Sequence, residues 1–279
     1  MKKKALVLDI DGTLTNSRKE ITSLTRKKIQ NIQKMGHVVI LASGRPTKGM
    51  EAPAKELMLS QYGGYMLSFN GGRIVHCSTG EVVYQKTLPP HVVPRLHDYA
   101  LAHDMGIVTY KDDVVLCGTR MDEYLSLESK INHMDVVISE NFKQDTHFPL
   151  NKCLLTAPPA AAAAHEKALK ERFGEELSIY RSEPFFIEVM PKNIDKAASL
   201  DVLLNQIGMT KKDAICCGDG FNDLSMIQYA GIGVAMANAQ DVIKKAADFI
   251  TLSNDEDGIA YVIDRFILKD PAHYEIAEN

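Results

Sequence analysis

The chain has 279 residues, of which 45% are hydrophobic and 24% are charged, and its formal net charge is −4 at pH 7. A chain of this length can bury a full core and form one large domain or two smaller ones. The composition is that of an ordinary globular protein, and the small negative charge excludes bulk recruitment of nucleic acid through phosphate neutralisation. We therefore expect no nucleic-acid partner.

The sequence pattern does not indicate a membrane protein or a secreted protein. The basic start is followed by an apolar run that Asp9 interrupts after a few residues, which is too short for a signal peptide. No other stretch approaches the roughly 20 apolar residues that span a bilayer. The five cysteines are scattered and have no metal-ligand spacing, which is typical of a reducing compartment. These patterns predict a cytoplasmic location and no membrane partner, and they leave the oligomeric state open, with a monomer compatible.

The first part of the chain alternates apolar strands with amphipathic helices. The predicted elements are a strand over 4–10, a helix over 21–35, a strand over 37–43, a helix over 46–59 and a strand over 64–72. Pro53 has to lie at the start of its helix or in a kink. Strands separated by helices and short loops indicate a parallel sheet with right-handed crossovers.

The pattern changes after residue 73. Residues 73–88 are typical of a hairpin, and Pro89-Pro90 breaks the chain after it. Helical stretches then mix with short strands up to about residue 190. The predicted helices are 92–103, 121–132 and 158–173, and the predicted strands are 106–111, 114–118, 151–157, 178–182 and 185–191. This stretch predicts a separate α+β domain.

The last ninety residues return to the first pattern. A helix is predicted over 196–209, a strand over 212–220, a helix over 222–231, a strand over 232–239 and a further helix and strand over 241–251. The fold class is therefore α/β, with a Rossmann-like parallel-sheet core formed by residues 1–83 and 190–279. Residues 84–189 form an inserted α+β domain.

Polar residues follow four of the predicted core strands. They are Asp9 and Asp11, then Ser43, Gly44 and Arg45, then Asn70, Gly71 and Gly72, and finally the stretch from Gly218 to Asp223. Because ligands bind at the carboxyl ends of parallel strands, we expect these residues to meet in one crevice. If the backbone stays extended through residue 11, Asp9 and Asp11 share one face of the strand, with Ile10 on the other.

Each of these residues also has a common structural explanation that involves no ligand. Asp-x-Asp-Gly is most often a turn or a helix cap, and Lys196 near a helix start would be a solvated charge. Four carboxylates in one crevice, however, would repel one another unless a cation neutralised them. The four are Asp9, Asp11, Asp219 and Asp223. Oxygen ligands without histidine or cysteine favour a hard ion, which indicates magnesium.

The motifs Asp9-Ile10-Asp11-Gly12-Thr13-Leu14, Ser43-Gly44-Arg45, Lys196 and Gly218-Asp219-Gly220-Phe221-Asn222-Asp223 resemble the four ordered motifs of the haloacid dehalogenase-like phosphatases. The long insert and Ser68-Phe69-Asn70-Gly71-Gly72 resemble the Cof-type sugar phosphatase branch, and the likeness covers nearly the whole chain. The third motif departs from the Gly-Val-(Ser/Asp)-Lys-Gly of that branch. Asn193 stands where glycine is usual, and it tolerates the same left-handed backbone. Ala197 requires a helical backbone after the lysine.

The resemblance implies a role for each matching residue. Asp9 would be the nucleophile that forms an aspartyl-phosphate, and Asp11 the general acid and then the base. Ser43 would hydrogen-bond the phosphoryl group, and Lys196 would offset its charge. The implied magnesium ligands are the carboxylates of Asp9 and Asp219 and the backbone carbonyl of Asp11, with Asp223 binding directly or through water. The implied substrate-binding residues are Gly44, Arg45, Asn70, Gly71 and Asn222.

The resemblance further implies that the insert over 84–189 is an α/β cap, which closes over the crevice and supplies substrate contacts. The predicted function is a magnesium-dependent phosphatase that hydrolyses small phosphorylated metabolites, sugar (hexose) phosphates first among them. Alternatives are a phosphomutase of the same architecture, a nucleotide or cofactor phosphatase acting on pyridoxal or flavin phosphates, and a non-catalytic sensor of phosphometabolites. The last needs neither a nucleophile nor its acid partner, and both are present.

Overall fold

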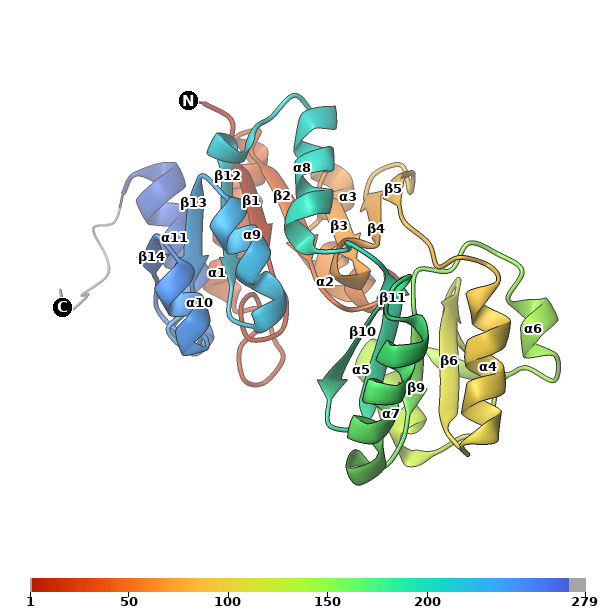
Figure 1. The fold of residues 1–279 in the computed structure, drawn as a ribbon. Coiled ribbons are helices and arrows are strands. Elements are labelled where there is room, and N and C mark those ends of the chain that lie inside the picture. Colours follow the sequence, from red (N-terminus) through yellow and green to blue (C-terminus); the bar gives the residue numbers. More distant parts are fainter. Residues whose placement is uncertain (1, 271–279) are drawn as a thin grey trace. The chain divides into compact units, whose positions relative to one another are not determined.

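The structure is a computed structural model that describes residues 2–270, and the chain forms two compact units (Figure 1). The first unit contains residues up to 44, then 50–84, and then the chain from 195 onward. The second contains 45–49 and 85–194. The sequence pattern placed 45–49 in the core, whereas these five residues group with the inserted part.

An eight-stranded sheet runs through the first unit in the order β14-β13-β12-β1-β2-β3-β4-β5. Its strands are β1 (Ala5–Leu8), β2 (Val38–Ala42), β3 (Tyr65–Ser68), β4 (Arg73–His76), β5 (Val82–Gln85), β12 (Ala214–Gly218), β13 (Ile232–Ala235) and β14 (Phe249–Ile250). The pairings from β14 to β3 are parallel, and β4 pairs antiparallel with β3. The predicted α/β class with a parallel-sheet core is therefore confirmed.

Helices cover both faces of this sheet (Figure 1). They are α1 (Ser23–Lys34), α2 (Glu51–Glu56), α3 (Leu59–Tyr62), α8 (Lys196–Gln206), α9 (Leu224–Tyr229), α10 (Asp241–Ala246) and α11 (Gly258–Ile263). Leu6 and Leu8 of β1 pack with apolar residues of α1 and α11, whereas Ala5 and Val7 pack with α8. Burial of β1 on both faces is typical of a central strand in a parallel sheet.

The single helix predicted over 46–59 is wrong. A short 3-10 turn over Lys48–Met50 precedes α2, and Met58 has a left-handed backbone (φ 59°) between α2 and α3. A residue in that conformation cannot continue a right-handed helix. Pro53 lies in the first turn of α2, where its missing N–H costs no intrahelical hydrogen bond.

The first strand also ends earlier than predicted, at Leu8 rather than Ile10. The chain then turns, since the N–H of Leu14 donates to the carbonyl of Asp9 (3.2 Å) and the N–H of Thr15 donates to that of Ile10 (2.9 Å). The first strand therefore ends before both acids, whereas the sequence predicted that it extends through Ile10. Ile10 is buried with the residues around Leu8, and Asp11 belongs to the turn.

The second unit has a six-stranded sheet in the order β10-β11-β9-β6-β7-β8, in which only the β7–β8 pair is parallel. Its strands are β6 (Gly106–Lys111), β7 (Val114–Cys117), β8 (Asp135–Ile138), β9 (Cys153–Thr156), β10 (Leu177–Glu183) and β11 (Phe186–Pro191). Its helices are α4 (Val92–Ala102), α5 (Glu123–Asn132), α6 (Phe142–Asp145) and α7 (Pro159–Phe173). The sequence did not predict β8 or α6, because β8 is a mostly exposed edge strand without apolar alternation.

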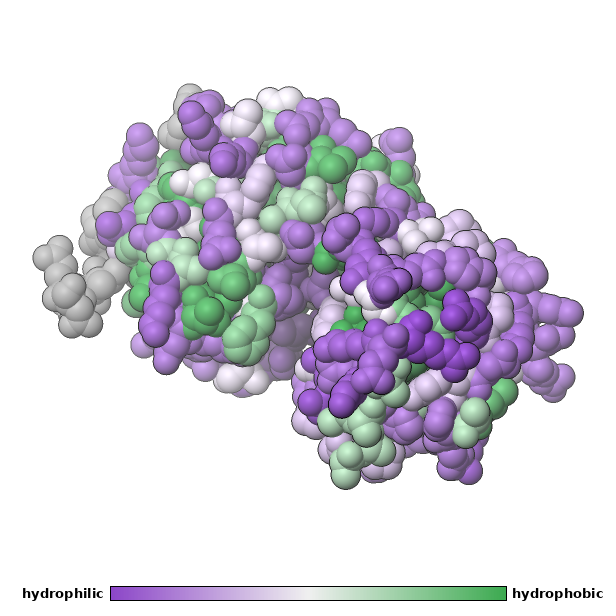
Figure 2. All heavy atoms as spheres, in the orientation of Figure 1, coloured by the Kyte–Doolittle hydropathy of each residue, from purple (hydrophilic) through white to green (hydrophobic). Residues whose placement is uncertain are grey.

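Hydrophilic residues cover most of the face in Figure 2, and apolar side chains appear there in small separate groups. Across residues 2–270, no helix combines the length and the apolar character needed to cross a membrane.

Candidate active site

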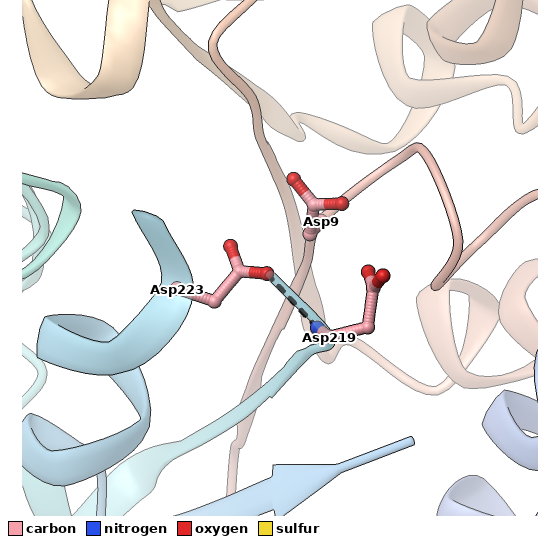
Figure 3. Close-up of side chains that lie close together, drawn as sticks. All are labelled: Asp9, Asp219 and Asp223. Atoms are coloured by element: carbon pink, nitrogen blue, oxygen red, sulfur yellow. Dashed lines mark hydrogen bonds between the residues drawn. The ribbon is translucent and has the colours of Figure 1, made fainter. Parts of the chain in front are cut away.

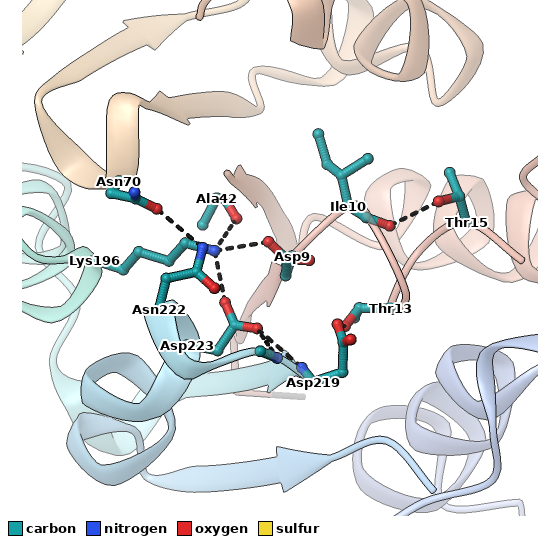
Figure 4. Close-up of polar contacts among 11 residues, drawn as sticks. Asp9, Ile10, Thr13, Thr15, Ala42, Asn70, Lys196, Asp219, Asn222 and Asp223 are labelled. Carbon is teal, nitrogen blue, oxygen red and sulfur yellow. Dashed lines mark hydrogen bonds and ion pairs between the residues drawn. The ribbon is translucent and has the colours of Figure 1, made fainter. Parts of the chain in front are cut away.

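Asp9 follows β1 directly and is almost completely buried. Its N–H donates to the carbonyl of Cys217 (3.1 Å), so that the ladder between β1 and β12 holds the residue at the carboxyl edge of the sheet. Its carboxylate accepts a hydrogen bond from Lys196 through Oδ1 (2.7 Å; Figure 4). The backbone of Asp9 is thus fixed by the sheet and its side chain by a cation.

Lys196 begins α8 and has no exposed surface. Its Nζ donates to Asp9 Oδ1, to Asp223 Oδ1 (2.6 Å) and to the carbonyl of Ala42 (2.8 Å), which uses all three of its protons (Figure 4). Asp195 caps the helix by accepting the N–H of Ala198 (2.9 Å). Asn193 has the left-handed backbone that glycine would supply at this position of the third motif, with φ 54°.

Asp219 and Asp223 come from the chain that follows β12. Asp223 is completely buried, and its Oδ2 accepts the N–H of Asp219 at 2.9 Å (Figure 3). The same oxygen accepts the N–H of Gly220, also at 2.9 Å. Gly218 allows this turn, because a Cβ there would lie 2.4 Å from the Cβ of Asp223. Three donors already contact the Asp223 carboxylate, which orients Lys196 and the loop that carries Asp219.

One oxygen from each of Asp9, Asp219 and Asp223 lies within 4.8 Å of the others. Burial and the carboxylate of Asp223 raise the pKa of Asp9 to about 8, although Lys196 opposes that shift. Burial raises the pKa of Asp219 to about 6 despite the hydrogen bond from Thr13. Burial lowers the pKa of Lys196, but Asp223 and Asp9 outweigh this and raise it above its usual range. The negative charge of the cluster therefore exceeds what Lys196 offsets.

These residues fit a hard divalent cation. The donors are carboxylate oxygens, and a metal ion held by them would offset their excess charge. The cluster does not include the side chain of Asp11.

Asp11 lies in the turn after Asp9, and 38% of its side chain is exposed. Its Oδ1 accepts a hydrogen bond from Lys19 Nζ at 3.0 Å. No sequence motif predicted a role for Lys19.

The second and third strand ends contribute to the same edge. Ser43 is buried, its N–H donates to the carbonyl of Leu67, and its carbonyl accepts the N–H of Asn70 (both 2.9 Å). Asn222 Nδ2 donates to Asn70 Oδ1 at 3.0 Å (Figure 4). A Cβ on Gly44 would lie 3.2 Å from Asn70 Oδ1. The loops after β2, β3 and β12 are therefore adjacent here.

The other two predicted substrate-binding residues are Gly71, which belongs to the first unit, and Arg45, which belongs to the second. Gly71 has φ +100°, and a Cβ there would lie 2.2 Å from Ser199 Oγ, so this glycine allows the loop to approach α8. Arg45 groups with the second unit, and its Nη1 donates to the carbonyl of Gly49 (3.1 Å).

Two supporting contacts were not predicted from the sequence. Thr13 Oγ1 donates to Asp219 Oδ1 (2.8 Å), and Asn238 Nδ2 donates to the carbonyl of Gly12 (2.8 Å). Thr13 belongs to the first motif, so its contact with the site could have been predicted from the sequence. The contact of Lys196 with the carbonyl of Ala42 could not, because every residue has a backbone carbonyl.

Gly12 provides a test of this packing. Its φ is +84°, and a Cβ would lie 2.4 Å from Asp219 Oδ2. We expect Gly12→Ala to displace Asp219, to lower the catalytic rate by at least about tenfold and to destabilise the fold by about 1–3 kcal/mol. Steady-state kinetics and urea unfolding measure the two effects. The matched control is Gly80→Ala, which has a similar φ of +71° but no atom within 4 Å of the added Cβ. Equal activity of both variants would contradict the expected displacement.

Comparisons of this chain with known proteins agree on one protein family. The haloacid dehalogenase-like hydrolase family matches residues 6–263. A 5-amino-6-(5-phospho-D-ribitylamino)uracil phosphatase from Bacillus subtilis, YcsE, is 30% identical over 271 residues, which cover 95% of this chain and 96% of that protein. The crystal structure of a haloacid dehalogenase-like hydrolase from Bacteroides thetaiotaomicron is 45% identical, with a TM-score of 0.92 over 95% of this chain and 100% of that one.

A subclass IIB sugar phosphatase of the same superfamily, BT4131, has a TM-score of 0.78 at 24% identity over 95% of this chain and 99% of that one, and so shares the fold. The match over most of the chain, together with relatives named as phosphatases, identifies the protein as a phosphatase. The chain belongs to the haloacid dehalogenase-like hydrolases, in their Cof-type phosphatase branch.

Proposed function

We propose that the protein is a magnesium-dependent phosphatase that hydrolyses small phosphorylated metabolites through an aspartyl-phosphate on Asp9. The observation that carries this proposal is the buried Asp9–Asp219–Asp223 cluster, with Lys196 holding Oδ1 of Asp9. A site that only bound phosphate would favour cations over three buried carboxylates. A carboxylate held beside a cation at a sheet edge is suited to attack on phosphorus.

In the first step an oxygen of Asp9 attacks phosphorus, and the bond between phosphorus and the ester oxygen breaks. Protonated Asp11 gives its proton to the departing oxygen, so that a neutral alcohol leaves. In the second step water attacks phosphorus, and the Asp11 carboxylate takes the proton from that water. The bond between Asp9 and phosphorus breaks, inorganic phosphate leaves, and both aspartates return to their starting states.

The remaining residues position the phosphoryl group and balance its charge. Ser43 would donate a hydrogen bond to it, and Lys196 would offset part of its negative charge. Asp9, Asp219 and the carbonyl of Asp11 would hold Mg²⁺, with Asp223 supporting them through Lys196 and the Asp219 backbone. Bound Mg²⁺ would neutralise charge on the phosphoryl oxygens.

Substrate recognition belongs, in this proposal, to Gly44, Arg45, Asn70, Gly71 and Asn222 and to a cap formed by residues 84–189. Two kinds of substrate have support from similar proteins. BT4131 is named a sugar phosphatase, and YcsE is named for a phosphorylated ribitylamino compound. Both substrates are phosphate esters of a polyhydroxylated carbon chain, and we propose that chemistry as the substrate class, with hexose phosphates first. The free thiols of all five cysteines fit a reducing, cytoplasmic setting.

The test is release of inorganic phosphate from a panel of hexose, pentose, nucleotide, pyridoxal and flavin phosphates and 5-amino-6-(5-phospho-D-ribitylamino)uracil, each with and without Mg²⁺. We expect turnover to be fastest on a polyol or sugar ester. Product analysis on the best substrate separates hydrolysis from mutase transfer. Binding without turnover on every member would contradict the proposal and favour a sensor.

Metal removal is expected to stop the reaction. Chelation by EDTA should lower the rate at least about 100-fold, because the buried carboxylates then repel the phosphoryl group. Excess Mg²⁺ should restore activity, whereas Ca²⁺, which takes longer bonds and more ligands, should restore little. Phosphate release before and after dialysis measures both effects. A rate unchanged by chelation, at metal contents checked by mass spectrometry, would contradict the metal assignment.

A further inference from the structure

A short loop next to the site, residues 16–20, is closed on itself by hydrogen bonds. Asn16 Oδ1 accepts the N–H groups of Arg18 and Glu20, both at 3.0 Å. In the backbone, the N–H of Lys19 donates to the carbonyl of Asn16 (2.9 Å), and the N–H of Asn16 donates to that of Glu20 (3.0 Å). The loop therefore has a defined shape of its own.

The same loop is attached to the body of the first unit. The N–H of Ser17 donates to Asp255 Oδ1 (2.8 Å), and Asn254 Nδ2 donates to the carbonyl of Thr15 (2.9 Å). These bonds join the loop to the 3-10 turn over Asn254–Glu256, more than 230 residues away in sequence. The position of Lys19 is thus set by the fold and not by local sequence alone.

Lys19 has a left-handed backbone, with φ 64°. This conformation is unfavourable for a residue with a side chain. Its ammonium lies 3.0 Å from Asp11 Oδ1, but 66% of the lysine side chain is exposed. Exposed ion pairs contribute little to folding stability. The hydrogen bonds of the loop hold the backbone of Lys19, so that the consequence of the ion pair is the restraint that it places on the Asp11 carboxylate.

We propose that Lys19 is a positioning residue that holds the Asp11 carboxylate toward the leaving group, an inference that rests on the proposed function. Asp11 belongs to the turn after β1 and its side chain is partly exposed, so the sheet does not fix its carboxylate and the contact with Lys19 restrains it. Proton transfer requires the acid to lie within about 3 Å of the leaving oxygen. A displacement of about 1 Å can cost a factor of about 100 in rate.

The test compares the first chemical step for two kinds of ester. An alkyl phosphate needs a proton on its leaving oxygen, whereas p-nitrophenyl phosphate releases a stable phenolate without one. We expect Lys19→Met to lower the single-turnover rate of alcohol release from the best alkyl phosphate by about tenfold or more, and that of p-nitrophenol release by less than about twofold. Lys19→Arg, which keeps the charge, should recover most of the rate.

The matched control is Arg18→Met, which removes an exposed cation from the same loop that pairs with Glu20 (3.2 Å). It should leave both rates unchanged. Adding Lys19→Met to Asp11→Asn should cause no further loss, because the lysine acts through that carboxylate. Equal losses on both esters, no loss on either, or additive losses in the double variant would overturn the positioning role.

The proposed function fails in a different way. If Asp11→Asn itself does not slow the alkyl ester selectively, Asp11 is not the acid, and the inference falls with it. If Asp11→Asn shows the selective loss and Lys19→Met does not, only the positioning role is wrong. Thermal unfolding of each variant should match that of the parent protein, since the replaced lysine is exposed.

Discussion

Asp9→Asn is expected to lower phosphate release by about 10⁴-fold or more, because an amide cannot form the acyl phosphate. The protein should remain folded. The amide oxygen can still accept the proton of Lys196, which also keeps Asp223 and the carbonyl of Ala42. Removing one buried carboxylate from a crowded cluster also relieves repulsion, so that the melting temperature should not fall. Steady-state kinetics and thermal unfolding measure the two outcomes.

The matched control for this variant is Asp241→Asn, at the exposed start of α10. It makes the same chemical change away from the site and should leave the rate unchanged. A trapping experiment adds a second readout: acid quenching during turnover should yield a labelled phosphoprotein in the parent and none in Asp9→Asn. Retained activity, or label that persists in the variant, would assign the nucleophile elsewhere.

Lys196→Met should both inactivate and destabilise the protein. The substitution leaves Asp9 and Asp223 buried without their shared cation, and breaking a buried ion pair typically costs about 3–5 kcal/mol. It also removes the charge that would face the phosphoryl group. Chemical denaturation should therefore show a much lower free energy of unfolding, and phosphate release should fall at least about 100-fold.

Lys245→Met on the exposed side of α10 is the control for removing a lysine charge, and it should change the free energy of unfolding by less than about 0.5 kcal/mol. A second variant, Lys196→Met with Asp223→Asn, should regain part of the lost stability because one buried charge is gone. A cost below about 1 kcal/mol for Lys196→Met alone would show that the buried pairing does not hold the site together.

Much of the fold was predictable because the patterns are local. The apolar strands separated by amphipathic helices predicted the parallel sheet and the inserted α+β part, and both are observed. The errors lie where a single backbone conformation decides the outcome. Met58 breaks the helix predicted over 46–59, and the turn after Leu8 ends the first strand early. Neither residue type signals these conformations, which depend on packing around them.

The sequence by itself determined which polar residues follow the core strands, since strand ends and motifs are properties of neighbouring residues. Strand ends alone therefore predicted that Asp9, Ser43, Asp219 and Asp223 lie at one edge of the sheet, and the family resemblance added Lys196. Only the tertiary structure decided that Lys196 is fully buried against the carbonyl of Ala42 and that Lys19 reaches Asp11. These contacts join loops that are distant in sequence or depend on one backbone angle, and such geometry follows from how the whole chain packs.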